Sequence, residues 1–434
     1  MRLNPEIRRY IWLEFSLQRL VVMPLVIAVI FYIASNGHNT DQKMITASIF
    51  IFTVLIAAWG GNKAAASITD EVNENTWDFQ RLSSISPFSL SCGKIFGSAL
   101  YCWYGAVMAL VVYIYVNLSH MPPDTVFANS VILIFSGLIC HATAIISSLQ
   151  VAQVKSIGRK KIQAIFSHII GLLIASMFIS GIVDYERDNY ELIKWYGESY
   201  NYNKFIAFFS VIAFLWIFSG IYWQIRNQLR MSTGPWLWIA FVLFIIFFIA
   251  GLDTNYWRYS EESHILLNSY IIGIFFLYCM VFIEPWSGLL YRRLSDSWKT
   301  RNVKKFMSLF PRWLANFLLV LVLAFLVIFT YFNKYIMCLS ILASLGFIIR
   351  DIAILHYFKL YPNAKRAHTA AIFYLFILYS LIPLLLASVG AKQAVNLFII
   401  VPKEGFITIS LLSGYLQAAF FVFLALKRWK KYWH

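Results

Sequence analysis

Long apolar stretches that recur along the whole chain are the feature that most constrains its fold. A helix that crosses a membrane needs about 20 mostly apolar residues, because it rises ~1.5 Å per residue and the hydrocarbon core is ~30 Å thick. About twelve such stretches follow one another, and each is expected to form a transmembrane helix. They lie at 20–35, 45–61, 95–117, 127–151, 162–183, 205–224, 236–252, 265–283, 313–332, 335–354, 369–390 and 405–426.

The composition excludes the soluble classes. Of the 434 residues, 60% are hydrophobic and only 13% are charged, against roughly 45–50% and about 25% in soluble domains. A soluble fold of this size could not bury so much apolar surface, so a cytosolic or secreted enzyme, a disordered chain and a collagen-like fibre are excluded. The five cysteines are scattered and form no C-x-x-C pair, which supports neither a disulfide framework nor a metal site. The sequence predicts an all-α polytopic membrane protein.

The basic residues sort by side of the membrane. If both termini are cytoplasmic, 28 of the 36 Lys and Arg residues fall on the inner side, as the positive-inside rule requires. The outer side then holds Lys43, Arg187, Lys194, Lys204, Arg258, Lys334, Lys392 and Lys403. The net charge of +16 therefore follows from topology, and we expect no nucleic-acid partner.

The segment 1–19 is predicted to be an amphipathic helix in the inner membrane interface. Asn4-Pro5-Glu6 is a typical helix start, with a capping side chain, a preset φ and an acid near the helix N-terminus. The apolar residues Ile7, Ile11 and Phe15 recur every four positions with Tyr10 beside them, as expected of a helix lying on lipid. A general positive-inside anchor is the alternative. We expect the first span to be retained, because no convincing cleavage site follows it.

The inner loop predicted at 62–94 differs from every other inner loop because it is acidic at its start. Thr76 is expected to cap a short helix that exposes Trp77, Phe79 and Leu82, and Ser86-Pro87 to restart the chain toward the third span. Exposed apolar side chains at the inner membrane face need a partner to cover them. The sequence favours a cytoplasmic protein as that partner, with an ordinary amphipathic loop as the alternative.

These residues resemble a family. The order of Glu71, Thr76, Trp77-Asp78-Phe79, the Leu-Ser-x-Ile-Ser-Pro run at 82–87 and Gly93-Lys94 is similar to type-2 permeases of ATP-binding-cassette exporters. The resemblance covers about 1–225 and implies that the loop forms a coupling helix docked on a separate ATPase subunit. The residues it implies for coupling are Glu71, Thr76, Trp77, Phe79, Arg81, Leu82, Ser86, Pro87 and Lys94.

The resemblance also implies the domains and partners. Residues 20–225 would form a six-span permease core, and 226–434 would add six further spans, as an extension or a degenerate repeat. The chain would act in a bacterial plasma membrane as a homodimer or with a related permease. ATP and Mg²⁺ would be bound by the partner subunit, because the pattern G-x-x-x-x-G-K-[ST] is absent here. We expect no catalytic residue, metal or cofactor in this chain itself.

Polar residues within the spans are few. Arg350-Asp351 are expected near the interface with Arg350 snorkelling to water, since neighbouring residues do not face each other on a helix; a gate or an inter-helix ion pair is the alternative. His141 and His168 are expected to be hydrogen-bonded packing residues, with a proton relay as the alternative. Asn129, Asn268, Asn316 and Gln417 are predicted to bond between helices.

Two other functions remain open at the level of sequence. A polytopic enzyme acting on lipid-linked substrates would need a polar or metal-binding cluster at one membrane face, and no such spacing is present. A secondary carrier would need ionisable residues at the midplane or matched interrupted helices. Only a weak repeat is visible, with 295–312 as a second interfacial helix and 350–368 as a shortened coupling loop.

Overall fold

The apolar runs are helical wherever the structure describes them. The computed structural model describes residues 4–83, 85–151, 169, 171–173, 175–177, 179, 192–229, 231, 233–252, 265–284, 288–360, 366–399 and 405–433. It divides into two units, Met1–Thr233 (unit 1) and Gly234–His434 (unit 2). The sequence placed this boundary at 225/226, but the last helix of unit 1 continues to Gln228.

Ten helices of the described chain are long and apolar enough to cross a membrane. They coincide with ten of the predicted spans, which agrees with an all-α polytopic membrane protein. The segment 236–252 forms the shorter apolar helix Trp236–Gly251. The predicted span 162–183 lies largely outside the described residues, as does His168. Helices suit these segments because every backbone N–H and C=O is then bonded within the segment, where lipid offers no partner.

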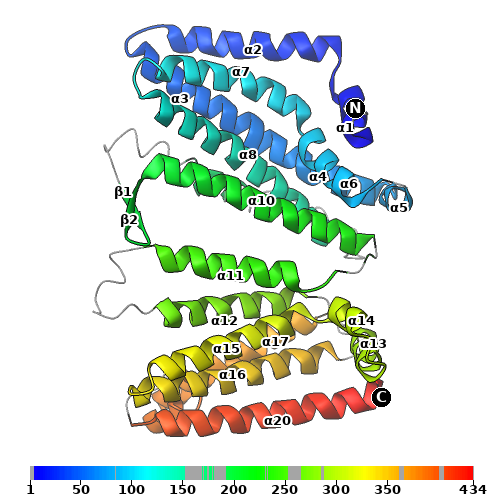
Figure 1. Ribbon diagram of the computed structural model, residues 1–434, viewed down its shortest axis with the longest axis vertical. Coiled ribbons are helices and arrows are strands. Elements are labelled where there is room, and N and C mark those ends of the chain that lie inside the picture. The colour runs from blue at the N-terminus through cyan, green and yellow to red at the C-terminus, as the bar shows by residue number, and fades with distance from the viewer. Residues whose placement is uncertain are drawn as a thin grey trace. The chain divides into compact units, whose positions relative to one another are not determined.

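Unit 1 is a bundle of spanning helices with short helices at one end and a hairpin at the other (Figure 1). Its elements are α1 (Pro5–Glu14), α2 (Leu17–Ser35), α3 (Thr40–Thr53), η1 (Val54–Gly60), α4 (Gly61–Asn73), α5 (Trp77–Leu82), α6 (Pro87–Cys92), η2 (Gly93–Gly97), α7 (Leu100–Asn117), α8 (Pro123–Val151), β1 (Leu192–Trp195), β2 (Glu198–Asn201) and α10 (Tyr202–Gln228). The short helices α1, α5 and α6 gather at the end where the N-terminus lies.

The second span is longer than predicted, and the loop that follows it is shorter. α3, η1 and α4 form one continuous helix, Thr40–Asn73, so residues 62–73 are helical rather than part of the predicted loop 62–94. Ala64, Ala65 and Ile68 of this extension are buried. Their packing explains the difference, because small side chains let helices approach closely and so extend the ordered helix past the apolar run.

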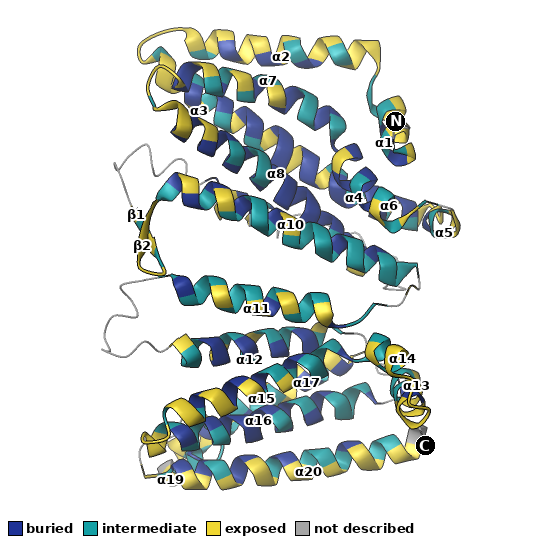
Figure 2. Ribbon diagram, in the orientation of Figure 1, coloured by how far each residue is buried: buried dark blue, intermediate teal, exposed yellow. Residues whose placement is uncertain are grey.

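The core of unit 1 centres on α8, which packs against α10 and α4. Figure 2 shows α8 mostly buried, whereas α2 carries an exposed face. Gly137 of α8 lies so close to Ile56 that a Cβ at this position would overlap the Ile56 side chain. His141, one turn further on, lies with Nε2 2.9 Å from the carbonyl oxygen of Ile56 in the π-helix η1. The π-helical turn interrupts the regular hydrogen bonding of the α-helix, and the His141 side chain contacts the Ile56 carbonyl there. The prediction that His141 is a hydrogen-bonded packing residue is confirmed.

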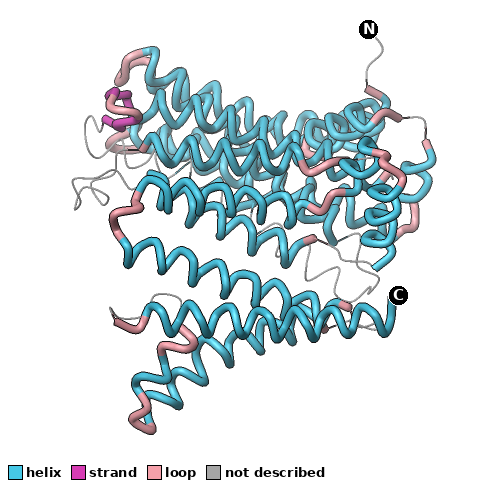
Figure 3. The backbone as a smooth tube through the Cα atoms, turned by 60° about the horizontal axis from the view of Figure 1, so that its bottom comes forward, coloured by secondary structure: helices cyan, strands magenta, loops and turns pink. Residues whose placement is uncertain are grey.

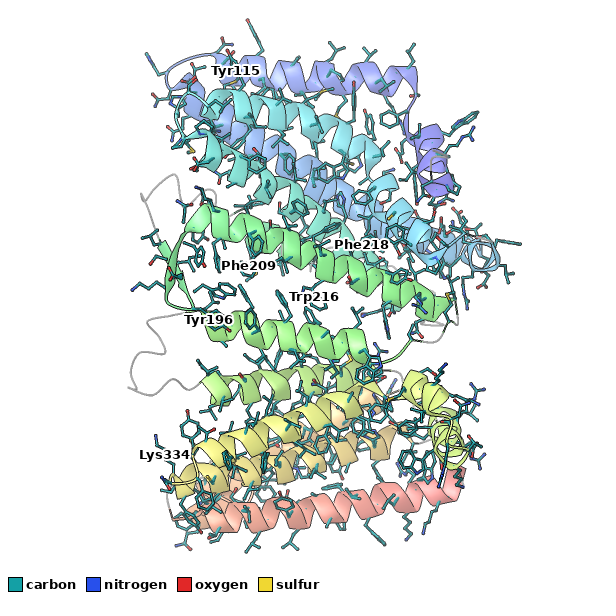
Figure 4. All side chains as sticks on the ribbon, viewed as in Figure 1. Tyr115, Tyr196, Phe209, Trp216, Phe218 and Lys334 are labelled. Carbon is teal, nitrogen blue, oxygen red and sulfur yellow. The ribbon has the colours of Figure 1, made fainter. Side chains whose placement is uncertain are left out.

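A small antiparallel hairpin is an exception to the all-α prediction. β1 and β2 pair from Leu192 with Asn201 to Trp195 with Glu198. The two residues between them, Tyr196 and Gly197, both have positive φ, as a type I′ hairpin turn requires. The hairpin lies at the end of unit 1 opposite α1 (Figure 3), and Trp195 packs on Phe209 of α10. Figure 4 labels Tyr196 and Phe209 at this end.

Unit 2 is also a helical bundle. Its elements are α11 (Trp236–Gly251), α12 (Ile265–Ile283), α13 (Gly288–Lys299), α14 (Val303–Leu309), α15 (Arg312–Thr330), α16 (Tyr335–Lys359), α17 (Ala367–Phe376), η4 (Ile377–Leu381), α18 (Ile382–Ser388), α19 (Lys392–Val395) and α20 (Ile407–Trp433). α16 packs along α20, and at Gly346 a Cβ would lie 3.1 Å from the backbone of Gly414. Glycine at the crossing therefore allows the two backbones to come close.

The contact at Gly137 gives a test of the core of unit 1. We expect Gly137→Ala to lower stability by about 1–3 kcal/mol, because the added methyl overlaps the branched side chain of Ile56. Gly220→Ala is the matched control, since its Cβ would meet only the end of the Ile146 side chain, at 3.2 Å. Thermal unfolding of the purified protein measures both. A drop no larger in Gly137→Ala than in the control would contradict the close packing.

Candidate functional site

The N-terminal helix α1 begins as the sequence predicts. The side chain of Asn4 accepts a hydrogen bond from the Glu6 N–H, Pro5 occupies the first turn, and Glu6 adds a negative charge there. Asn4 also reaches outside its own helix, because its Nδ2 donates to the Ser89 carbonyl of α6 at 2.6 Å. The cap thus fixes both the start of α1 and its position beside α6.

Two glycines allow α1 to lie directly on η2. A Cβ at Gly93 would overlap the Glu6 side chain, and a Cβ at Gly97 would lie 2.6 Å from the Tyr10 ring. Gly93 and Gly97 are four residues apart and therefore share one helix face. The Gly-Lys pair noticed in the sequence is therefore part of a contact surface for α1.

Four charged side chains meet where α1, α4 and η2 come together; we call Glu6, Arg9, Glu71 and Lys94 the anchor cluster. Lys94 has no exposed surface, and its Nζ lies 2.6 Å from Glu71 Oε1 and 2.9 Å from Glu6 Oε1. Arg9 lies 2.6 Å from Glu71 and 2.7 Å from Glu6. Two cations and two carboxylates balance, which is required when charges are removed from water.

Neutral donors and acceptors complete the cluster. Lys94 Nζ also donates to the Ser67 carbonyl at 3.2 Å and to the Tyr10 hydroxyl at 3.4 Å. Gln80 of α5 donates to Glu71 Oε1 at 2.7 Å. Glu71 thereby joins α1, η2 and α5 through one oxygen.

The cluster keeps Arg9 charged and Tyr10 neutral. Partial burial disfavours the charge of Arg9, but the hydrogen bond to Glu71 and the nearby carboxylates outweigh it and raise the pKa of Arg9. Burial also raises the pKa of the Tyr10 hydroxyl, against the opposing effect of Lys94. The ionic contacts are therefore insensitive to titration of either group in the neutral range.

The apolar residues of the short helix α5 differ in burial. Phe79 is 75% exposed and Leu82 is 85% exposed, as predicted. The prediction was wrong for Trp77, which is buried beside Ile68 and Leu90. Helical geometry explains the difference, because the start of α5 packs against α4 and only the far face of the helix remains uncovered. In Figure 2, α5 shows exposed colour beside intermediate and buried colour, since Asp78, Phe79 and Leu82 are exposed.

The predicted cap at Thr76 is also wrong. Thr76 precedes α5, but its side chain makes no capping bond; its hydroxyl donates instead to the Glu71 carbonyl at 3.2 Å. The bond satisfies the C-terminal end of α4, which leaves orphan carbonyls. The restart at Ser86-Pro87 is confirmed, since Ser86 accepts from the Ser89 N–H and Pro87 begins α6.

α5 and α6 also contact the last spanning helix of unit 1. Arg81 pairs with Asp78 at 2.9 Å and its Nε donates to the Gln228 carbonyl at the end of α10, at 3.1 Å. Phe88 of α6 packs edge-on against Phe218 of α10, with ring centroids 5.8 Å apart. The segment 77–92 therefore contacts the N-cap of α1, α4 and α10.

The predicted lipid face of α1 is only partly correct. Tyr10 is buried against η2, and Phe15 packs on Tyr101 and Tyr104. Ile7 and Ile11 are half-buried. The sequence instead missed Trp12 and Leu13, which are exposed. Gly93 and Gly97 decide which face of α1 turns toward η2, because the absence of side chains at these two positions lets the helices come close.

A second charge cluster lies inside unit 2 and corrects the expectation for Arg350. Arg350 does not snorkel: it is fully buried within α16, and Asp351 is buried with it. Contrary to prediction the two neighbours do interact, with Arg350 Nε donating to Asp351 Oδ1 at 2.9 Å. Arg350 also donates to Gln417 of α20 at 2.7 Å. Because α16 continues to Lys359, 350–359 is not a loop.

Tyrosines from two further elements satisfy Asp351. Tyr278 of α12 and Tyr379 of η4 donate to Asp351 Oδ2 at 2.6 and 2.7 Å. The carboxylate thus accepts bonds from three elements, and the bundle of unit 2 closes around it. Such a cluster is strong inside a bundle because the alternative is an unsatisfied charge in lipid.

Three of the four predicted inter-helix amides make the expected bonds. Asn129 accepts from Asn203 of α10 at 2.8 Å, Asn316 donates to the Gly273 carbonyl of α12 at 3.2 Å, and Gln417 accepts from Arg350. No bond is described for Asn268.

Outside the gaps in the described chain, no group of three or more His, Cys, Asp or Glu residues could hold a metal ion. A scan against models of protein families and searches of curated proteins and of solved structures found no match to this chain.

The anchor cluster predicts a large effect of one neutral substitution. We expect Glu71→Gln to lower the free energy of unfolding by about 3–5 kcal/mol, because Lys94 and Arg9 would keep only Glu6 as counter-charge. Asp70→Asn changes the neighbouring exposed carboxylate and should have an effect within about 0.5 kcal/mol. Thermal unfolding compares the two; equal effects would show that the cluster does not stabilise the fold.

Asp351 gives the corresponding test in unit 2. We expect Asp351→Asn to cost about 3–5 kcal/mol, since a buried Arg350 would lose its counter-charge, whereas Tyr278→Phe removes one hydroxyl donor and costs about 1 kcal/mol. Asp296→Asn, at an exposed position of α13, is the control. Thermal midpoints in the same detergent would contradict this ranking if Tyr278→Phe were the more damaging change.

Proposed function

We propose that this chain is the membrane-spanning permease subunit of an ATP-binding-cassette exporter in a bacterial plasma membrane, driven by a separate ATPase subunit. The observation that carries the proposal is the contrast within the segment 71–94. Its base is held by the anchor cluster, while Phe79 and Leu82 at its tip are exposed beyond the ends of the spanning helices. The order of residues in the same segment resembles the coupling region of type-2 permeases.

In this proposal α5 is the coupling helix. An apolar pair on a short helix outside the membrane needs a complementary surface, and a shallow groove on the ATPase subunit would supply it. Glu74 and Asp78 precede the pair in the chain, and both are exposed. A groove with basic residues at its edge would therefore complement the tip.

Force would pass from the ATPase to the spans through the contacts already described. ATP binding would close the ATPase dimer and push α5, and the anchor cluster would pass the movement to α1 and α4. Arg81 and Phe88 would pass it to α10. In this mechanism Glu71, Lys94 and Trp77 hold the coupling helix, Phe79 and Leu82 dock it, and Ser86-Pro87 returns the chain to the membrane.

Two ATPase sites would have to be driven, and the part of unit 1 that the structure describes carries one proposed coupling helix. We therefore propose a homodimer of this chain or its pairing with a related permease, with both termini cytoplasmic and twelve spans in all. ATP and Mg²⁺ would bind in the partner subunit. Unit 2 would be an extension of the permease.

Site-specific cross-linking tests the docking role of α5. A photoreactive amino acid at position 79, in membranes of the source cells, should cross-link to a protein that carries a phosphate-binding loop, identified by mass spectrometry. Phe79→Ala with Leu82→Ala should reduce recovery of that ATPase with the tagged chain by about tenfold or more, since two buried apolar contacts contribute roughly 1.5–3 kcal/mol each.

The control variant is Leu118→Ala with Phe127→Ala, a pair of exposed apolar residues at the other end of α7 and α8. It should leave recovery of the ATPase unchanged. If no nucleotide-binding subunit cross-links at position 79, and the 79/82 variant retains all of its partners, the coupling role is wrong.

A further inference from the structure

Unit 2 contains an apolar groove that the proposed coupling mechanism does not use. It has a volume of about 500 Å³ and lies between α15, α16 and α20, with α13 at one end. Leu314 and Phe317 form one wall, Ile352 and Ala353 the second, and Val422 and Leu426 the third. Apart from Tyr291 at one end, His356 is the lining residue with an ionisable side chain, and its Nδ1 is held 2.7 Å from the Ile352 carbonyl oxygen. The groove therefore suits a hydrocarbon ligand.

The length and direction of the groove match one leaflet of a bilayer. Its lining on α16 extends from Ile349 to Leu360, which at ~1.5 Å per residue is about 16 Å. Half of a ~30 Å hydrocarbon core is about 15 Å. The groove ends where α15 begins and where α16 and α20 end, so it opens at one membrane surface.

Aromatic residues with polar edges mark this open end, which we call the mouth. Trp313 Nε1 donates to the Tyr291 hydroxyl at 2.8 Å, and the Tyr291 and Trp429 rings lie 6.1 Å apart. Tryptophan and tyrosine collect where hydrocarbon meets headgroups. The mouth therefore lies at headgroup depth.

Each helix at the mouth carries a basic residue beside its lining residue. Arg292 follows Tyr291, Arg312 precedes Trp313, Lys359 precedes Leu360, and Arg428 and Lys430 flank Trp429. Three of them are bonded within the protein: Arg312 pairs with Glu284 at 3.3 Å, Lys359 donates to the Val281 carbonyl at 2.8 Å, and Arg428 donates to the Tyr357 hydroxyl at 2.7 Å. Arg292 and Lys430 are exposed. Exposed basic residues on the two helices that meet at the mouth of an apolar groove complement a molecule with a hydrocarbon tail and an anionic head.

We propose that this groove binds one anionic phospholipid, with an acyl chain between α15, α16 and α20 and the phosphate group beside Arg292 and Lys430. A zwitterionic lipid would fill the groove equally well but would gain less from the rim. The bound lipid would tie the amphipathic helix α13 to the ends of the spanning helices. The inference rests on unit 2 alone and does not depend on the coupling role of α5.

Native mass spectrometry of the purified full-length protein tests this site, with phosphatidylglycerol and phosphatidylcholine of identical chains as probes. The wild-type chain should retain one phosphatidylglycerol in preference to phosphatidylcholine. Arg292→Gln with Lys430→Gln should weaken phosphatidylglycerol binding about 10- to 30-fold, at about 1 kcal/mol for each surface charge. Lys334→Gln, at the opposite end of unit 2 (Figure 4), is the charge control and should change nothing.

A second variant tests the groove separately from the charge. Ala425→Phe places a ring in the groove, where Ala425 is a lining residue, and should abolish retention of the lipid. Val322→Phe puts the same ring on an exposed face of α15 and should not. Equal retention of the two lipids by the wild-type chain would overturn the anionic site, and full retention by Ala425→Phe would overturn the groove. The charge variant, Arg292→Gln with Lys430→Gln, alters only exposed residues. If Ala425→Phe fails to fold, phosphatidylglycerol binding by the charge variant and by the wild-type chain still decides the proposal.

Discussion

Lys94 is an ammonium group with no exposed surface, and much of unit 1 is arranged so that its charge is balanced. A buried cation is tolerated only when carboxylates and hydrogen-bond acceptors surround it. Glu6 comes from the N-terminal helix, Glu71 from the end of the second span, and the Ser67 carbonyl from the turn before. Removing either carboxylate would leave Lys94 and Arg9 with a single counter-charge, so the N-terminal helix, the second span and the start of the third are held together by the anchor cluster.

Unit 2 also buries a cation that needs a counter-charge, but the counter-charge comes from a different place in the chain. Arg350 finds its counter-charge on the next residue, and the surrounding helices then supply the remaining partners, Gln417 and two tyrosines. In unit 1 the charges join separate segments, whereas in unit 2 a local pair is enclosed by several helices. Lys94 and Arg350 are both fully buried, and we expect both arrangements to make the fold sensitive to loss of a single carboxylate.

A firmly held base and an uncovered tip are the combination that the proposed coupling contact would need. If α5 were loosely attached, a displacement of Phe79 and Leu82 would move the loop without moving the spanning helices. If those side chains were buried, a partner protein could not bind them. The lipid groove of unit 2 follows the same logic from the membrane side, since its apolar walls need a hydrocarbon occupant and its basic mouth selects the head.

The sequence by itself determined the helical membrane architecture, since ~20-residue apolar runs in lipid can satisfy their backbone only as helices, and it determined the helix starts at Asn4 and Ser86 from local chemistry. It also indicated 71–94 as a distinctive segment and the amides that join helices. The tertiary structure decided which face of α1 turns inward, that Trp77 is buried while Phe79 is not, that Arg350 is enclosed rather than snorkelling, and that Lys94 meets Glu6. These outcomes depend on contacts between residues far apart in the chain, such as Gly93 with Glu6 and Arg81 with Gln228, and helical periodicity carries no information about which distant helix will approach a given face.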